Sequence, residues 1–204
     1  MSKKITIIDY GMGNLYSVQN ALRSIGAEPV VTSDAAVIAQ AEKILLPGVG
    51  AFGDCMANLE KSGLIPVIMD RLHSGKPFLG ICLGMQLLFE GSDEAPGVKG
   101  LGFFKGQVRL LHTELKIPHM GWNSIDIKEG SRLFEGIDRQ SYMYFVHSYY
   151  LKARNPEDVA ATTWYSTDIH AAVEHDNIFA CQFHPEKSSE LGLRILKNFA
   201  DLRL

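Results

Sequence analysis

Hydrophobic residues in the first half of the chain fall into short runs separated by helically spaced sets. The runs at 4–9, 28–31, 43–46 and 77–81 are typical of buried strands. Between the first two runs, segment 15–25 has apolar residues at helical spacing and is followed by a glycine, so it is predicted to be a helix.

Further helices are predicted on either side of the run at 77–81. The segment 53–72 has helical spacing, and Gly63 and Pro66 divide it into two helices. A shorter helix follows the run and ends at Gly91. Strands that alternate with helices in this way predict a parallel sheet covered by helices on both faces.

The second half of the chain has a different pattern, in which strands follow one another without helices between them. Six short strands are predicted, at 105–111, 122–127, 141–151, 158–164, 169–174 and 178–183. An amphipathic helix is predicted at 188–202. Because consecutive strands favour antiparallel pairing, we expect an α/β fold with a mixed sheet, to which the second half adds antiparallel strands. With no repeat or linker in view, residues 1–204 are predicted to form one domain.

Composition and charge narrow the function classes. The formal net charge of −3 is too small and of the wrong sign for an electrostatic nucleic-acid binder. No window holds the roughly 18 unbroken apolar residues of a membrane span, and the amino terminus lacks the apolar stretch of a signal peptide. Three cysteines without Cys-x-x-Cys spacing indicate neither a disulfide framework nor a zinc site. We therefore expect a cytosolic protein with no metal or cofactor and no nucleic-acid or membrane partner.

A candidate nucleophile, Cys82, lies between the strand at 77–81 and the helix after it. The segment Gly80-Ile81-Cys82-Leu83-Gly84 is a G-x-nucleophile-x-G pattern with cysteine as the nucleophile. A strand that turns sharply into a helix exposes that residue above the carboxyl edge of the sheet, and the helix N-terminus favours a thiolate. The N–H of Leu83 points toward the same site and is a candidate oxyanion donor.

A candidate base follows the predicted strand at 178–183. His184 ends the strand, because Pro185 cannot continue a hydrogen-bonded ladder. Glu186 lies two residues further on, where a carboxylate can reach the imidazole. A histidine oriented by a carboxylate and facing a cysteine from elsewhere in the chain is the arrangement that activates cysteine nucleophiles.

The segments GICLGMQ and QFHPE together resemble the class I (triad) glutamine amidotransferases. Four further segments, IDYGMGNLYSVQNAL, LPGVGAFGDCM, PHMGWNS and YFVHSYY, are similar to the glutaminase subunits of imidazole glycerol phosphate synthases, enzymes of histidine biosynthesis. The resemblance covers nearly the whole chain. It implies a flavodoxin-like mixed sheet and a Cys82-His184-Glu186 catalytic triad that hydrolyses glutamine to glutamate and ammonia.

The resemblance also implies further roles. The family's glutamine-binding positions are matched by Gly48, Gly50, Gln86, His147, Ser148 and Tyr149. The second oxyanion donor is matched by the Val49 N–H. The implied partner is a cyclase shaped as a (β/α)8 barrel, which uses the ammonia to make imidazole glycerol phosphate and an aminoimidazole carboxamide nucleotide. Positions near that partner are matched by Asn14, Trp122, Tyr144 and Lys187.

Glycines on both sides of Val49 suggest a switch, because a peptide bond flanked by glycines turns over at low cost. Such a turn would exchange a carbonyl for an N–H in the oxyanion site. We hypothesise that binding of the partner determines which of the two orientations this peptide bond adopts.

Two alternatives stay open at this point. One is the amidotransferase subunit of anthranilate or aminodeoxychorismate synthase, against which the GMGN and PHMGWNS segments argue. The other is a non-catalytic flavodoxin-like protein that binds a phosphate at the GMGN loop. The second alternative offers no account of Cys82 or His184.

Overall fold

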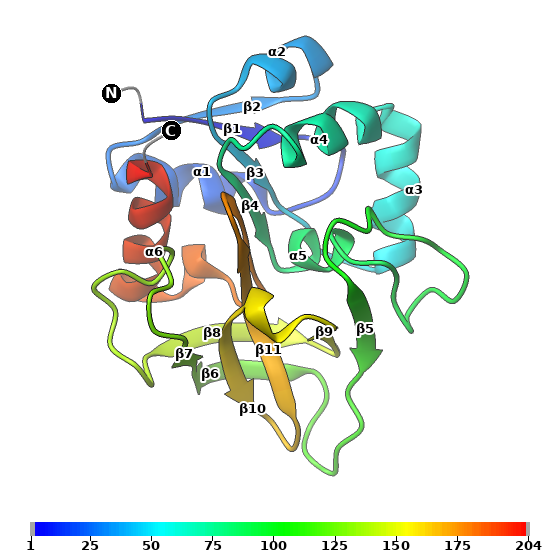
Figure 1. Ribbon diagram of the computed structural model, residues 1–204, viewed down its shortest axis with the longest axis vertical. Coiled ribbons are helices and arrows are strands. Elements are labelled where there is room, and N and C mark those ends of the chain that lie inside the picture. The colour runs from blue at the N-terminus through cyan, green and yellow to red at the C-terminus, as the bar shows by residue number, and fades with distance from the viewer. Residues whose placement is uncertain (1–2, 203–204) are drawn as a thin grey trace.

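A mixed eight-stranded sheet runs through the middle of the computed structural model, which describes residues 3–202 (Figure 1). From one edge to the other, its strands are β2 (Glu28–Thr32), β1 (Lys4–Ile8), β3 (Ile44–Leu46), β4 (Phe78–Ile81), β12 (Ile178–Cys181), β11 (Asp168–His175), β10 (Val159–Trp164) and β7 (Asp126–Ile127). Neighbouring strands from β2 to β12 are parallel. The antiparallel strands β11, β10 and β7 then extend the sheet.

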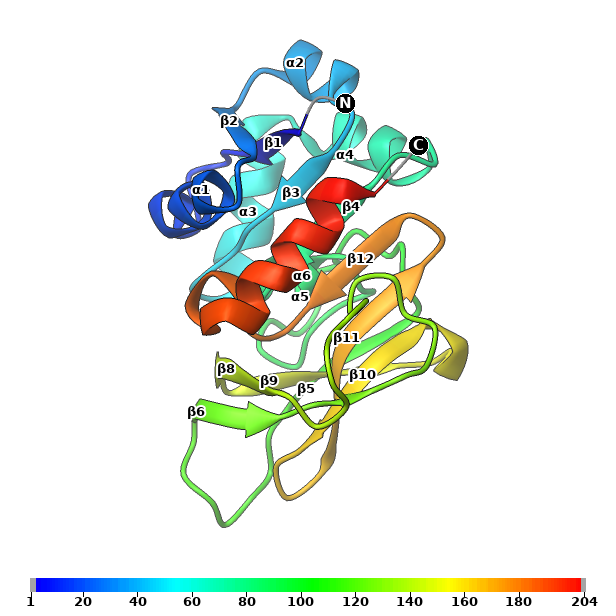
Figure 2. The ribbon, with the colours of Figure 1, turned by 90° about the vertical axis from the view of Figure 1, so that its left-hand side faces the viewer.

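Helices cover both faces of the parallel part of the sheet, as Figure 2 shows from the side. One face carries α1 (Leu15–Ser24) and α6 (Ser189–Asp201). The other carries α2 (Ala35–Gln40), α3 (Phe52–Ser62), α4 (Ile65–Leu72) and the short α5 (Leu83–Leu87). Two 3₁₀ turns, η1 (Pro156–Asp158) and η2 (Pro185–Lys187), complete the helical segments of the described residues.

The core is divided by the sheet into two clusters, because successive side chains of a strand point to opposite faces. Leu45 of β3 packs with α1 and α6, whereas Ile44 and Leu46 pack with α3, α4 and α5. All four residues of β4 are buried. Burial on both faces explains why the central strands read as unbroken apolar runs in the sequence.

Two small antiparallel sheets lie beyond the carboxyl edge of the parallel strands (Figure 1). One pairs β5 (Gly106–Leu110) with β9 (Tyr149–Ala153), and the other pairs β6 (His119–Ser124) with β8 (Tyr142–His147). The predicted α/β fold, with a mixed sheet and antiparallel strands from the second half, is confirmed.

Several predicted element boundaries are wrong. The strand expected at 141–151 is two strands that break at Ser148, and the strand expected at 122–127 is also two. Four of the later strands form the small sheets and do not join the large one. The helix expected to reach Gly91 ends at Leu87, and α2 was not predicted. The expected domain over 1–204 stays a prediction, and its residues 1–2 and 203–204 lie outside the described residues.

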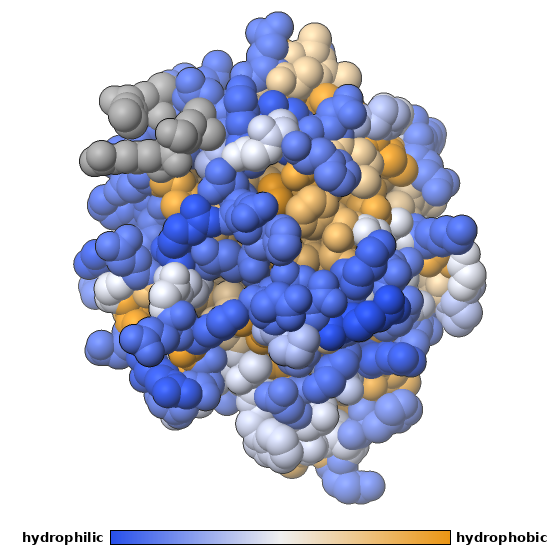
Figure 3. Space-filling model, viewed as in Figure 1, coloured by the Kyte–Doolittle hydropathy of each residue, from blue (hydrophilic) through white to orange (hydrophobic). Residues whose placement is uncertain are grey.

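The surface seen in the first view is mostly hydrophilic, with hydrophobic residues gathered around α4 (Figure 3). Across residues 3–202, every helix is too short or too polar to cross a lipid bilayer.

Candidate active site

Cys82 lies at the sharp bend where β4 ends and α5 begins. Its φ angle is 55°, in the left-handed region that residues with a side chain rarely adopt. A hydrogen bond of 2.8 Å from the Cys82 N–H to the carbonyl of Cys181 ties the bend to the neighbouring strand β12. The strand-to-helix bend predicted at Cys82 is therefore present.

Two glycines allow α5 to pack directly on the strands beneath it. A Cβ atom on Gly84 would lie 2.0 Å from the carbonyl oxygen of Leu46, and one on Gly80 would lie 2.9 Å from the oxygen of Gly84. Both contacts are with backbone atoms, which cannot move aside as a flexible side chain can. The glycines of the G-x-C-x-G pattern are thus required by close approach of the backbone.

His184 follows β12 and lies between Cys82 and Glu186. Its Nδ1 donates a hydrogen bond of 2.8 Å to Oε1 of Glu186, and the two side chains are only 3% and 1% exposed. Burial alone would lower the pKa of His184, but hydrogen bonds and charge interactions with Cys82 and Glu186 outweigh it and raise the pKa to about 10. The imidazole is therefore a cation at neutral pH, held between a sulfur and a carboxylate.

A pocket of about 360 Å³ opens over Cys82. It is lined by residues from both halves of the chain: Val49, Gly50, Cys82, Leu83, Gln86, Glu94, Pro118, Val146, His147, Ser148, Tyr149, Gln182 and His184. Of the residues expected to bind glutamine or its oxyanion, Gly48 alone is not part of this lining. Glu186 lies behind His184 and reaches the pocket only through it.

Polar side chains that the sequence analysis did not assign also line this pocket. Gln182 is fully buried, and its side-chain nitrogen lies 3.8 Å from the sulfur of Cys82. Glu94 accepts a hydrogen bond of 2.7 Å from the N–H of Phe52 at the start of α3. Gln182 does occur in the QFHPE segment, but nothing in that pattern shows which way its amide points.

The segment Pro47–Gly50 follows β3 and lies against the start of α5, and we call it the oxyanion strand after the role predicted for Val49. The carbonyl of Gly48 accepts a hydrogen bond of 3.3 Å from the N–H of Leu83. Since a peptide's C=O and N–H point in opposite directions, the Val49 N–H is directed away from that of Leu83. Gly50 adopts a φ of +96°, which favours glycine.

Neighbouring side chains hold the carbonyls on either side of Gly48. The Tyr10 hydroxyl donates a hydrogen bond of 2.9 Å to the carbonyl of Pro47, and the Cys55 thiol lies 3.5 Å from the carbonyl of Val49. Burial raises the pKa values of both Tyr10 and Cys55, so both keep their protons and act as donors. These two side chains leave the Gly48–Val49 peptide free to turn, and the flanking glycines make such a turn possible.

Two buried histidines are in contact beside the pocket: His147 lines it, and His119 lies behind His147. His147 Nε2 lies 2.9 Å from His119 Nδ1, and the ring of His119 stacks against those of Phe145 and Tyr165. Burial lowers the pKa of His147 to about 3 and that of His119 to about 4. Both rings are therefore neutral at physiological pH.

Of the four residues expected near a partner, Lys187 lies in η2, which contacts both β8 and α1. Trp122 and Tyr144 are paired across β6 and β8, and their rings lie 6.0 Å apart. The N–H of His184 donates to the carbonyl of Tyr144, which joins β8 to the segment carrying the exposed Lys187. Asn14 caps α1 by accepting a hydrogen bond of 3.2 Å from the N–H of Ser17.

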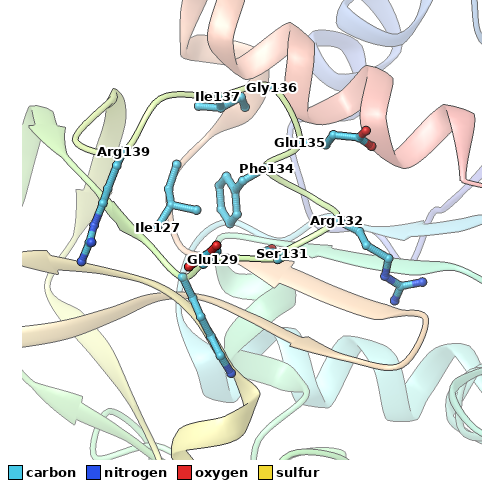
Figure 4. Close-up of a pocket in the computed structure, with 11 residues that line it drawn as sticks. Ile127, Glu129, Ser131, Arg132, Phe134, Glu135, Gly136, Ile137 and Arg139 are labelled. Carbon is cyan, nitrogen blue, oxygen red and sulfur yellow. The ribbon is translucent and has the colours of Figure 1, made fainter.

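A larger cavity of about 770 Å³ lies away from Cys82, beside the loop that follows β7. Figure 4 shows Ile127 and Phe134 inside this loop, whereas Arg132, Glu135 and Arg139 point away from it. Arg139 is paired with Asp126, and Arg132 with Glu174. Because these charged side chains point away from the loop, they do not converge on the cavity as the polar groups of a binding site would. Among residues 3–202, no group of three or more His, Cys, Asp or Glu side chains is placed to hold a metal ion.

Comparison with known proteins gives one consistent result. Residues 6–202 match the family described as glutamine amidotransferase class-I. The chain is 51% identical to the imidazole glycerol phosphate synthase subunit HisH of Syntrophotalea carbinolica, over 97% of this chain and 100% of that one. It is 52% identical to the protein of the same name from Methanothermobacter thermautotrophicus, over 97% and 98% of the two chains.

Solved structures with much lower identity share the fold. A glutamine amidotransferase superposes with a TM-score of 0.76 at 17% identity, covering 97% of this chain and 99% of that chain. PurLQS from Thermotoga maritima superposes with a TM-score of 0.76 at 20% identity, covering 98% of each chain.

Proposed function

The chain belongs to the class-I glutamine amidotransferases, and within them to the glutaminase subunits of imidazole glycerol phosphate synthase, and from that premise we propose that Cys82, His184 and Glu186 are its catalytic triad. The observation that carries the proposal is the buried row of sulfur, imidazole and carboxylate at the carboxyl edge of the sheet. Of the two alternatives weighed from the sequence, neither is favoured by these relatives.

The proposed reaction follows from the charge states of the triad. The Cys82 thiolate attacks the side-chain carbonyl carbon of glutamine, and negative charge develops on the carbonyl oxygen. His184, protonated and held by Glu186, gives its proton to the departing ammonia. A thioester between Cys82 and the glutamyl group remains. His184 then removes a proton from a water molecule as that water attacks the thioester carbonyl, which releases glutamate and restores the thiolate.

The pocket over Cys82 is proposed to hold the α-amino and α-carboxylate groups of glutamine. Gln86, Ser148 and Tyr149 line its wall, and Gly50 forms part of its rim. His147 supports that wall through a hydrogen bond of 2.9 Å from its Nδ1 to the carbonyl of Tyr149. Gly48 would take part through its peptide bond and not through a side chain.

The oxyanion donors are proposed to be the N–H groups of Leu83 and Val49. In the structure, the Leu83 N–H donates a hydrogen bond to the carbonyl of Gly48, so it is not available to an oxyanion. A half-turn of the Gly48–Val49 peptide would release that N–H and bring the N–H of Val49 beside it. Because one missing oxyanion donor costs roughly 10²–10³ in rate, we propose that the strand as described is a slow state.

The partner is proposed to be a cyclase with a (β/α)8 barrel that receives the ammonia. Relatives of this chain are named as synthase subunits, which implies a second subunit. The surface around η2 is the proposed contact, with Asn14, Trp122, Tyr144 and Lys187. None of the three cysteines is in a disulfide, in keeping with the reducing cytosol, where we propose that the enzyme works.

The decisive experiment is Cys82→Ala in the complex with the cyclase. We expect glutamine-dependent synthesis of imidazole glycerol phosphate to fall to background, because the nucleophile is gone. Synthesis from added ammonium salt should continue at the wild-type rate, because the cyclase site is untouched. Loss of both activities, or survival of both, would contradict the proposed role of Cys82.

A further inference from the structure

Gln182 has no part in the triad chemistry, yet it is fully buried against the nucleophile. It directly follows Cys181, which pairs with Ile81 across the parallel strands β12 and β4, so Gln182 lies beside Cys82. Its Nε2 is 3.8 Å from the sulfur of Cys82. A buried amide next to a sulfur either donates to it or presents an oxygen to it, and the two choices have opposite effects on a thiolate.

The orientation of this amide follows from a backbone carbonyl. The carbonyl of Tyr149 can only accept hydrogen bonds, and Gln86 lies 3.2 Å from it through Nε2. The second hydrogen of that NH₂ group is directed at Oε1 of Gln182, 2.9 Å away. Gln182 must therefore present its own NH₂ group, and not its oxygen, to Cys82.

The same carbonyl also accepts a hydrogen bond from neutral His147, which is in turn hydrogen-bonded to neutral His119. His147 Nδ1 donates a hydrogen bond to the Tyr149 carbonyl, so His147 Nε2 must accept a hydrogen bond from the N–H at His119 Nδ1. His119 Nε2 then accepts from the amide of Asn123, 3.2 Å away. Each ring therefore has one possible tautomer. Every hydrogen bond from Asn123 through His119 and His147 is donated toward the Tyr149 carbonyl.

We propose that Gln182 is a further catalytic residue, whose side-chain N–H, aimed by Gln86, stabilises the Cys82 thiolate and holds its sulfur in position for attack. This inference rests on the proposed function of Cys82. The Cys82 proton resides on His184, as in the triad mechanism, and Gln182 donates a hydrogen bond without transferring a proton. A donor to a charged group is worth more than one to a neutral group, and burial strengthens it further.

The test measures Cys82 directly, in the complex with the cyclase. Iodoacetamide alkylates thiolates, and Cys55 and Cys181 are fully buried, so the rate at which the Cys82 peptide of this chain is alkylated against pH reports on Cys82. Two variants are compared with the wild-type protein: Gln182→Met, which removes the donor and keeps the bulk, and Gln182→Glu, which places an acceptor at the sulfur. Glutamine-dependent kcat and KM and ammonia-dependent synthesis are measured alongside.

We expect the pH midpoint of alkylation to rise in both variants, and further in Gln182→Glu. We expect kcat/KM for glutamine to fall roughly 10- to 100-fold, the effect typical of a lost hydrogen bond to a charged group, mainly through kcat. Ammonia-dependent synthesis should be unchanged. An unchanged alkylation midpoint in both variants would overturn the proposal, whatever happens to kcat.

A second variant covers the case in which changes at Gln182 prevent folding. Gln86→Leu leaves Gln182 in place but removes the group that orients it, so the alkylation midpoint should rise here too. Because alkylation needs no glutamine, the expected loss of substrate affinity in this variant does not confuse the result. An unchanged midpoint in Gln86→Leu would overturn the proposed orientation. Failure of the triad itself would appear separately, as glutamine-dependent activity in Cys82→Ala.

Discussion

Single residues in this protein are placed by contacts that join distant parts of the chain. The elbow pattern and the His-Pro-Glu sequence are local, so Cys82, His184 and Glu186 could be identified as candidates from the sequence. Gln182 and Glu94 could not, because their importance lies in what they touch. The amide of Gln182 is directed by Gln86, and the two are 96 positions apart.

Protonation of the buried histidines should destabilise the protein in acid. The pKa values of His119 and His147 in the folded chain, about 4 and about 3, lie below the ordinary value of 6.5. The unfolded chain therefore binds more protons, and the stabilisation is complete above pH 6.5 and is lost as pH falls toward 4 and 3. Each histidine contributes a slope of up to about 1.4 kcal/mol per pH unit in that window.

Urea unfolding of the isolated chain between pH 4 and pH 8 measures this slope. The double variant His119→Gln/His147→Gln should be less stable at pH 8, because it loses hydrogen bonds, but its stability should depend less on pH. His112→Gln, at an exposed position, is the matched control and should keep the wild-type slope. An unchanged slope in the double variant would show that other groups govern the acid transition.

At the scale of elements, the oxyanion strand is the part that we propose must rearrange before the site can work. The Gly48 carbonyl accepts a hydrogen bond from the Leu83 N–H. Tyr10 and Cys55 hold the neighbouring carbonyls of Pro47 and Val49. A rearrangement can thus be confined to one peptide bond. The sequence suggested the switch through its glycines, but only the structure gives the conformation from which it would start.

Glutaminase turnover should therefore depend on the partner. With the isolated chain we expect a rate lower by roughly 10²–10³ than in the complex with the cyclase and its nucleotide substrate, because one or both oxyanion donors are missing. Glutamate release with and without each component measures the ratio. A rate for the isolated chain equal to that of the complex would mean that the oxyanion strand needs no partner to reorganise.

The contact between α5 and the strands should tolerate no side chain at Gly84. We expect Gly84→Ala to unfold the protein or to destabilise it by more than about 3 kcal/mol, since its Cβ would lie 2.0 Å from the oxygen of Leu46. Gly75→Ala is the control: Gly75 has a φ of +73° but nothing within 4 Å of a Cβ, so we expect a cost of about 1–2 kcal/mol. Denaturant unfolding of both variants measures the difference, and equal costs would contradict the packing argument.

Most of the parallel half could be predicted because its elements are long or strongly apolar. The runs at 43–46 and 77–81 are buried on both faces, and α3 ends at Gly63, while Pro66 lies in the first turn of α4. The helix α2 was missed because six residues give too little periodicity. The break at Ser148 was missed because nothing in a local pattern shows that β8 and β9 pair with different partners.

At the scale of the whole molecule, the small sheet β6–β8 presents large apolar side chains to solvent. Met120 is 58% exposed and Trp122 is 52% exposed on β6, and Tyr142 is 58% exposed on β8. Aromatic and methionine side chains are enriched at protein interfaces. The family resemblance directed attention to Trp122 and Tyr144, whereas the exposure of Met120 and Tyr142 required the strand register.

Removal of the Trp122 ring should weaken the complex and leave the fold intact. We expect Trp122→Ala to raise the Kd for the cyclase at least about tenfold. Truncation of a central interface tryptophan commonly costs roughly 2–4 kcal/mol of binding free energy. Val37→Ala on α2, also at an exposed apolar position, is the control and should bind as the wild type does. Calorimetric titration measures both, and an unchanged Kd for Trp122→Ala would exclude this face as the centre of the contact.

The middle of the large sheet is completed by β12, which comes from near the end of the described chain and lies directly beside β4. During synthesis on the ribosome, β4 and the Cys82 bend emerge about a hundred residues before that neighbour does. Until then the sulfur has no imidazole and the sheet has a gap at its centre. With the triad acting as we propose, a nascent chain cannot release ammonia into the cell, and the capacity to hydrolyse glutamine arrives together with the finished fold.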